Sequence, residues 1–293
     1  MPYTTLISTD TLAANLDAGW LIADGRYDLQ SDQWGRDEYF ACHIPGAVYV
    51  SLSGDLSSSP TGSNGRHPLP SLDAITATFS RLGLSDGIQV VAYDQDCGMF
   101  ASRLWWMLRY AGHDNAAVLD GGWGKWTAED RPTGSGSESR AAAPFTPRWR
   151  SDWHLDLDAV AVARRDPATL LLDARAAERF EGQVEPIDRL PGHIPGAANH
   201  PYRTNLSVEG TMLPRDVLRE QLLHDLRGHS PAQTVMYCGS GVSACHNLLA
   251  MEHAGLPGAR LYAGSWSEWS ADPRRPVETG PCRRERKQIV NRD

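Results

Sequence analysis

The sequence lacks the cysteine pattern of a disulfide-bonded or zinc-binding protein. Its five cysteines are odd in number, irregularly spaced and never form a CxxC pair: Cys42, Cys97, Cys238, Cys245 and Cys282. Disulfide frameworks use even sets, and zinc sites use short paired spacings. We therefore expect free thiols, no metal site and a reducing compartment, taken here as the cytoplasm.

Long apolar runs and an excess of positive charge are also missing. No stretch reaches the length of a membrane span, and "MPYTTLISTDTLAANL" (1–16) has no basic start followed by an apolar core. The net charge of −8 disfavours nucleic-acid binding, and the one basic run, "RRERK" (283–287), is expected to be a solvated tail. We expect a soluble protein with neither membrane nor nucleic-acid partners.

What the sequence does contain is an internal repeat. With 293 residues, 41% of them hydrophobic, the chain is long enough for two domains with cores of their own. Five motifs recur in the same order: WLIADGR and LLLDAR, HIPGA twice (43–47 and 193–197), QVVAYD and QTVMYC, two helical stretches ending in Ala-Gly, and LDGGWGKW and LYAGSWSEW. Such a succession indicates a tandem duplication.

The repeat predicts two α/β domains. We expect domains at 1–130 and 151–280, joined by a Gly/Ser/Pro-rich linker at 131–150 and followed by a tail at 281–293. In each half, short apolar runs alternate with helical patterns, which indicates a parallel sheet flanked by helices on both faces. Ligands bind beyond the carboxyl ends of such strands. Cys238 directly follows the run "TVMY", at such an end.

The segment "CGSGVSA" (238–244) predicts a strand-to-helix loop that stabilises an anion. Its glycines and small residues allow successive N–H groups to turn inward, and a helix starting near Ser243 adds its positive end. These features favour a reactive thiolate at Cys238 over the alternative, an inert buried cysteine. A tyrosine phosphatase would need an arginine at the sixth position after the cysteine, where this chain has Ala244.

With these motifs in both halves, the sequence resembles the tandem-domain rhodanese-type sulfurtransferases. "YFACHIPGAVYV" (39–50) is similar to the family's N-terminal signature, and "CGSGVSA" to the CGSGVTA loop of 3-mercaptopyruvate sulfurtransferases. The resemblance implies that Cys238 accepts sulfur as a persulfide, cradled by Gly239, Gly241, Val242 and Ser243. It also implies a catalytically empty first domain, in agreement with Asp94 at the position that matches Cys238.

Two further cysteines follow the matching loops. Cys97 lies in the loop after Asp94 but is displaced from the strand end, so we expect no second nucleophile there. Cys245 falls on the helix after the Cys238 loop. We interpret it as a core residue, with a resolving thiol as the alternative.

The resemblance further implies residues that hold the donor and move a proton. Arg179 and Arg189 match the family's two substrate-binding arginines, and Arg175 is interpreted as structural. Ser240, in the loop, would pair with a histidine from the first domain, for which His67 in "GRHPLP" is the candidate.

The acid of the family's Ser–His–Asp relay has no direct match. Ser53 occupies its position, and Asp55 lies two residues further on. The sequence leaves open which of them, if either, completes a relay with His67.

The resulting hypothesis is sulfur transfer from 3-mercaptopyruvate to an acceptor: a small thiol, thioredoxin or cyanide. No cofactor is expected apart from the covalent persulfide on Cys238. Thiosulfate is the alternative donor, disfavoured because the loop carries no cation of its own. If the protein is not an enzyme, the alternative is a non-catalytic module that binds persulfide.

Overall fold

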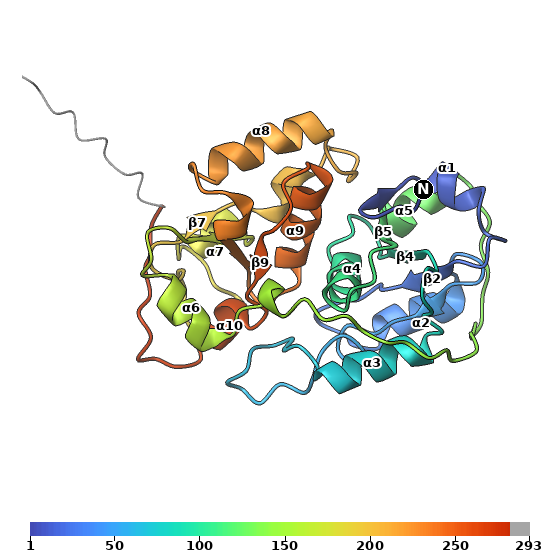
Figure 1. Ribbon diagram of the computed structural model, residues 1–293, viewed down its shortest axis with the longest axis horizontal. Helices are drawn as coiled ribbons and strands as arrows, with labels where there is room; N and C mark the ends of the chain where they lie inside the picture. Colours follow the sequence, from blue (N-terminus) through green and yellow to red (C-terminus); the bar gives the residue numbers. More distant parts are fainter. Residues whose placement is uncertain (282–293) are drawn as a thin grey trace, which may run out of the picture.

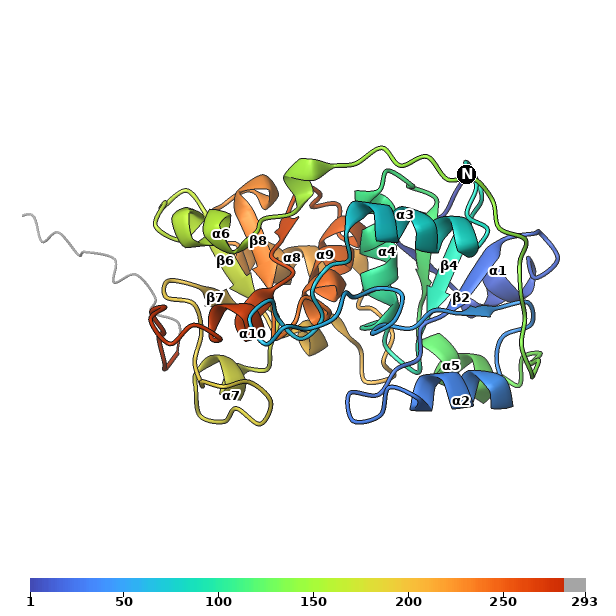
Figure 2. The same cartoon turned by 90° about the horizontal axis from the view of Figure 1, so that it is seen from below.

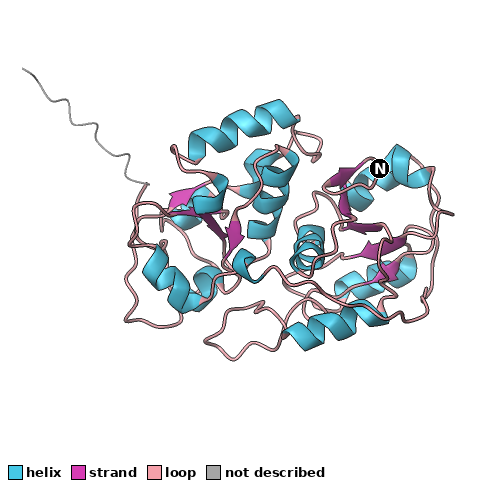
Figure 3. Cartoon of the chain, in the orientation of Figure 1, coloured by secondary structure: helices cyan, strands magenta, loops and turns pink. Residues whose placement is uncertain are grey.

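Two separate parallel sheets organise the chain, as the sequence predicted. The computed structural model describes residues 1–281, so Cys282 and the basic run 283–287 lie outside the described residues. Each sheet forms the centre of its own domain, with helices packed on both of its faces (Figures 1 and 3). In the described part of the chain, no helix combines the length and the apolar character that crossing a membrane requires.

The first domain has a five-stranded sheet in the order β1-β5-β4-β2-β3, with all pairs parallel. Its strands are β1 (Leu6–Ile7), β2 (Leu21–Asp24), β3 (Val48–Tyr49), β4 (Val90–Tyr93) and β5 (Ala116–Leu119). Its helices are α1 (Thr9–Ala13), α2 (Trp34–Ala41), α3 (Leu72–Arg81), α4 (Ala101–Tyr110) and α5 (Gly122–Ala128).

The second domain has a four-stranded parallel sheet in the order β7-β6-β8-β9. Its strands are β6 (Leu170–Asp173), β7 (Ala198–Asn199), β8 (Thr234–Tyr237) and β9 (Arg260–Leu261). Its α-helices are α6 (Leu157–Ala163), α7 (Ala177–Phe180), α8 (Arg215–Asp225), α9 (Ser243–His253) and α10 (Ser265–Trp269). Short 3₁₀ turns are η1 (Ser151–Trp153), η2 (Tyr202–Asn205) and η3 (Pro231–Gln233).

The central strands are buried along their whole length because helices cover both faces of each sheet. Every residue of β2, β4, β6 and β8 is buried, which explains why their sequences are continuous apolar runs. The register is also repeated: Asp24 pairs with Tyr93, and Asp173 with Tyr237. The loops after β4 and β8 therefore start from equivalent points.

The HIPGA histidines have the same structural role in both domains. The Nδ1 atoms of His43 and His193 lie 2.7 Å from the carbonyl oxygens of Tyr39 and Phe180, and their rings stack on those same residues. Both are buried. The duplicated histidines fix a turn and lie away from the Cys238 loop.

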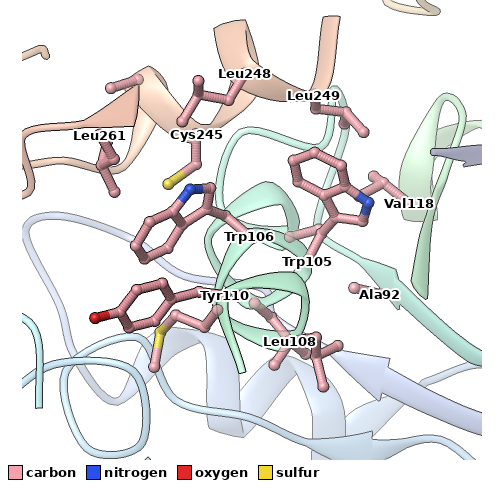
Figure 4. Close-up of a cluster of buried hydrophobic side chains, with 14 of the residues drawn as sticks. Ala92, Trp105, Trp106, Leu108, Tyr110, Val118, Cys245, Leu248, Leu249 and Leu261 are labelled. Atoms are coloured by element: carbon pink, nitrogen blue, oxygen red, sulfur yellow. The ribbon is translucent and has the colours of Figure 1, made fainter. Parts of the chain in front are cut away.

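Helices α4 and α9 join the two domains through an apolar interface. Figure 4 shows Trp105 and Trp106 on α4 facing Cys245, Leu248 and Leu249 on α9, all of them buried in one hydrophobic cluster. Because α4 follows the loop after β4 and α9 follows the loop after β8, this packing brings the two strand-to-helix loops toward the domain boundary.

The segment that connects the domains lies along the first of them (Figure 2). Its backbone donates from Ala143 to the carbonyl of Ser80 and from Arg148 to the carbonyl of Ala111. This connection is therefore anchored by backbone hydrogen bonds rather than spanning open solvent.

Candidate active site

Cys238 occupies the turn from β8 into α9. Its side chain is buried, and the Gly241 N–H donates to Sγ over 3.1 Å. Gly241 has φ +75°, and a Cβ there would lie 2.4 Å from the carbonyl oxygen of Ala263, so the turn requires glycine. Val242 and Ser243 lead directly into α9. The sulfur thus accepts a backbone amide at the positive end of a helix, an arrangement that favours an anion.

Ser265 holds the backbone of Cys238 in place through a side-chain hydrogen bond. The sequence analysis did not identify this residue. Its Oγ accepts the Cys238 N–H at 3.0 Å and donates to the carbonyl of Tyr262 at 2.9 Å. Ser265 is fully buried with φ +56°, a strained conformation for serine. The repeat offered a signal, because the first domain has Gly122 at the equivalent position with φ +54°.

His67 and Ser240 meet across the domain boundary. The Nδ1 of His67 lies 2.9 Å from the Oγ of Ser240, and both residues are buried. Burial lowers the pKa of His67 to about 4, with added effects of the charges on Arg103 and Arg66. The imidazole is therefore neutral at neutral pH and has one nitrogen available to accept a proton.

Arg103, on α4, holds the two halves of this pair together. Its guanidinium donates to the carbonyl oxygens of His67 at 3.0 Å and Gly241 at 3.2 Å. The side chain is fully buried, and its pKa is lowered by that burial while the nearby sulfurs of Cys245 and Cys238 oppose the shift. Sequence reasoning missed Arg103, although a lone arginine inside the apolar run "ASRLWWM" was a signal.

Neither candidate acid completes a relay with His67 in this structure. Asp55 accepts the backbone N–H of Ser51 and pairs with Arg81, and it lines a different hollow of the first domain. Ser53 lines the same cleft as His67 but carries no charge.

Asp32 is a first-domain acid that shares the cleft with His67. The hydroxyl of Tyr27 donates to Asp32, and the Tyr27 ring meets the His67 ring edge-on at 6.1 Å. Sequence reasoning did not single out this residue, because it precedes α2 rather than following a strand.

The interdomain cleft is a hollow of about 880 Å³ beside the Cys238 loop. Both domains line it, through Tyr27, Ser53 and His67 on one side and Asp188, Arg189 and Ser267 on the other. Arg189 is exposed on its wall. Arg66 and His67 line the cleft and also lie against the loop, at Gly239 and Ser240.

Arg179, which the resemblance implied to be a substrate-binding residue, lies at the Cys238 loop. Both terminal nitrogens of its guanidinium come within 3.7 Å of the point where a Cβ on Gly239 would lie. Arg179 donates to Glu185 at 2.6 and 3.2 Å and to Asp188 at 3.1 Å. Burial raises the pKa of Glu185, but hydrogen bonds from Arg179 and nearby amides outweigh it and leave that pKa below its usual value.

Arg175, by contrast, is buried in the core, where its guanidinium is paired with other groups of the fold. Its guanidinium bonds both oxygens of Asp173 and the carbonyl of Gly192, with 1% of the side chain exposed. Arg26 makes the same pair with Asp24 in the first domain. This duplicated ion pair belongs to the fold.

The remaining cysteines of the two loops are not activated. Burial raises the pKa of Cys245 to about 12, despite the nearby positive charge of Arg103, and its Sγ donates to the carbonyl of Gly241 at 3.2 Å. Burial also raises the pKa of Cys97, and the carboxylates of Asp94 and Asp96 add to the shift. Both observations agree with their interpretation as unreactive thiols.

Comparisons with known proteins give the family. The rhodanese-like domain family matches residues 8–129 and again 156–272. The chain is 43% identical over 280 residues to the "Probable 3-mercaptopyruvate sulfurtransferase" of Pseudomonas aeruginosa, covering 94% of this chain and 98% of that protein. It is 39% identical to the "Putative thiosulfate sulfurtransferase SseB" of Mycobacterium tuberculosis, covering 94% and 97%.

Solved structures agree. The 3-mercaptopyruvate sulfurtransferase SseA of Escherichia coli superposes with a TM-score of 0.78 at 31% identity, covering 90% of this chain and 99% of that one. The 3-mercaptopyruvate sulfurtransferase of Leishmania major gives 0.81 at 31%, covering 91% and 74%.

The chain belongs to the rhodanese-like family and carries two copies of its domain. It is an enzyme of the sulfurtransferase type rather than a non-catalytic module.

Proposed function

We propose that the enzyme moves sulfur from 3-mercaptopyruvate through a persulfide on Cys238. The Cys238 thiolate attacks the donor's sulfur, so that an S–S bond forms and the donor's C–S bond breaks. The electron pair of the C–S bond leaves on the enolate of pyruvate, which then takes up a proton. The observation that carries this proposal is the Cys238 sulfur at the start of α9, bonded by the Gly241 amide and adjoining an arginine-lined cleft.

The Ser240–His67 pair is suited to the proton. A hydroxyl 2.9 Å from a neutral imidazole can donate to the enolate and be reprotonated through the ring. Release of sulfite from thiosulfate needs no such carbon protonation. This difference favours mercaptopyruvate, in line with the names of the relatives in Pseudomonas, Escherichia coli and Leishmania.

In the second half of the reaction, an acceptor thiolate attacks the outer sulfur of the persulfide and regenerates Cys238. A small thiol, thioredoxin or cyanide would serve as acceptor. The arginines and the exposed mouth of the cleft suit small anionic donors, and no further cofactor enters this scheme.

Kinetics with both donors test the proposal. We expect a higher kcat/KM for mercaptopyruvate than for thiosulfate, and a higher value for thiosulfate would refute the donor assignment. His67→Gln should lower kcat with mercaptopyruvate by about 10²-fold while leaving thiosulfate turnover much less affected. Equal losses with both donors would remove the proton-transfer role from His67.

A further inference from the structure

The space beside Cys238 is filled by an arginine from the first domain. The Nη2 of Arg66 lies 2.8 Å from the point that a Cβ on Gly239 would occupy. Gly239 is not among the positive-φ glycines, so its backbone conformation does not require glycine. The absent side chain instead leaves room for a guanidinium against the loop. Arg66 immediately precedes His67, yet the sequence offered no reason to single it out.

The position of Arg66 is built by the fold rather than by a free side chain. Gly65 has φ +89° and packs so closely that a Cβ there would lie 2.9 Å from the Gly264 carbonyl oxygen. The Arg66 N–H donates to the Oγ of Ser267 on α10 at 3.1 Å. Figure 2 shows the segment between β3 and α3 reaching across to α10 of the second domain. One docked segment thus delivers both Arg66 and His67 to the Cys238 loop.

Two guanidiniums from opposite domains converge on this point. Arg179 approaches Gly239 from the second domain, and the carboxylate of Asp188 bonds both arginines, Arg66 through Oδ1 and Arg179 through Oδ2. The side chain of Arg66 is 28% exposed and that of Asp188 only 3%. The Asp188 carboxylate thus lies between two arginines beside Gly239, and an anionic group of the donor could bind these guanidiniums in the same way.

We propose that Arg66 is a donor-binding residue that holds the anionic end of the sulfur donor together with Arg179. It provides the positive charge that "CGSGVSA" lacks, so the site also accepts the dianion thiosulfate. This inference rests on the proposed function, since it concerns the donor of the same reaction. It also corrects the sequence-based reason for disfavouring thiosulfate: the loop carries no cation of its own, but the fold brings two guanidiniums to it, each paired with a carboxylate.

A structural tie between the domains is the competing explanation for Arg66. In that case the pair with Asp188 would be its whole role, and removing either partner would have the same effect. A donor-binding role predicts a difference. Without Arg66 the donor loses a guanidinium, whereas without the Asp188 charge both guanidiniums remain and a competing carboxylate is gone.

Steady-state kinetics of three variants distinguish these roles. Arg66→Met and Asp188→Asn are compared with Arg81→Met, a matched control whose arginine also pairs with an aspartate but lies outside the cleft. We expect Arg66→Met to raise KM for thiosulfate at least about fivefold, and more than KM for mercaptopyruvate. Asp188→Asn should leave KM for thiosulfate unchanged or lower it, because it removes a competing carboxylate, and Arg81→Met should stay within about twofold of the wild-type KM.

The inference is overturned if Arg66→Met raises KM for thiosulfate less than fivefold, or if Asp188→Asn raises it as much as Arg66→Met. Circular dichroism and thermal unfolding of all variants identify losses caused by misfolding. Wild-type enzyme that forms no persulfide with either donor would instead refute the proposed function. Wild-type enzyme that forms one, with an unaffected Arg66→Met variant, refutes only the role of Arg66.

Discussion

The two domains carry the same strand-to-helix turn with different side chains in it. After β4, the Asp94 carboxylate accepts the amides of Gly98, Phe100 and Ala101 at 2.7 to 3.1 Å. After β8, the Cys238 sulfur accepts the amide of Gly241. Gly98 and Gly241 both have positive φ and hold equivalent places before their helices. Both turns thus present backbone amides to the side chain that follows the strand, and in the first domain a carboxylate accepts them.

The residues that reach each turn from the other domain also correspond. Arg103 on α4 donates to the carbonyl of Gly241, and His246, at the equivalent place on α9, lies 3.2 Å from the carbonyl of Cys97. Burial lowers the pKa of His246 to about 4, so it is neutral at neutral pH. The turn after β8 therefore faces the buried positive charge of Arg103, whereas the turn after β4 faces a neutral imidazole at the equivalent place.

Exchanging the nucleophile should give the largest effect. Cys238→Ser is expected to lower sulfur transfer by about 10³-fold or more, because the serine hydroxyl stays protonated and cannot form a persulfide. Cys97→Ser, in the corresponding loop of the first domain, should leave kcat within about twofold. Activity assays with circular dichroism spectra check both, and a comparable loss in Cys97→Ser would break the distinction between the two loops.

Replacing Arg103 by histidine, the residue at the equivalent position 246, should have the next largest effect. Arg103→His removes the buried charge beside the turn after β8, the hydrogen bond to the Gly241 carbonyl, and two hydrogen bonds to the carbonyls of Leu56 and His67. We expect kcat to fall about 10- to 100-fold, as for the loss of a charged hydrogen bond. A variant that folds with wild-type turnover would show that this charge has no part in the reaction, and thermal unfolding reports whether it folds.

Weakening the turn after β4, which holds Asp94, should affect stability rather than catalysis. Asp94→Asn replaces a carboxylate that accepts several amides, and we expect about 1–3 kcal/mol less free energy of unfolding with kcat nearly unchanged. Urea unfolding and activity assays measure the two. A large loss of activity at wild-type stability would contradict a purely structural role for the first-domain turn.

Acid should lower the stability of both domains gradually, through buried histidines in each of them. Burial lowers the pKa values of His67, His154 and His246 to about 4, from 6.5. Between these values the unfolded chain binds more protons, so stability should fall as pH falls, by up to ~1.4 kcal/mol per pH unit for each histidine. Asp94, whose pKa burial raises to about 6, opposes them, as do Asp120 and Glu268, whose pKa values burial also raises. Urea unfolding at pH 4.5 and 6.5 measures the slope, and greater stability at pH 4.5 would contradict it.

The sequence predicted what depends on local pattern. Buried strands such as "VVAY" and "TVMY" have the apolar runs of a covered parallel sheet, and the repeat made the two domains evident. Cys238 stood out because it follows such a strand and precedes a glycine-rich turn. The approach of His67 to Ser240 was predicted only through the family resemblance.

Two of the residues that were missed act across the domain boundary. Arg66 and Arg103 reach the Cys238 loop from the first domain, and no spacing within the chain shows such an approach. Asp55 illustrates the opposite problem: it lies close to the expected position in sequence, but Arg81 and the backbone of Ser51 take its carboxylate. Side-chain direction, set by tertiary packing, decided both cases.

The central claim is that sulfur is carried on Cys238, and the intact mass of the protein tests it most directly. Wild-type enzyme and Cys238→Ser are incubated with 3-mercaptopyruvate, freed of excess donor and weighed without reductant. A persulfide intermediate predicts a gain of one sulfur atom in the wild type, lost again on adding dithiothreitol, and no gain in Cys238→Ser. No added sulfur in the wild type, or an equal gain in both proteins, would contradict it.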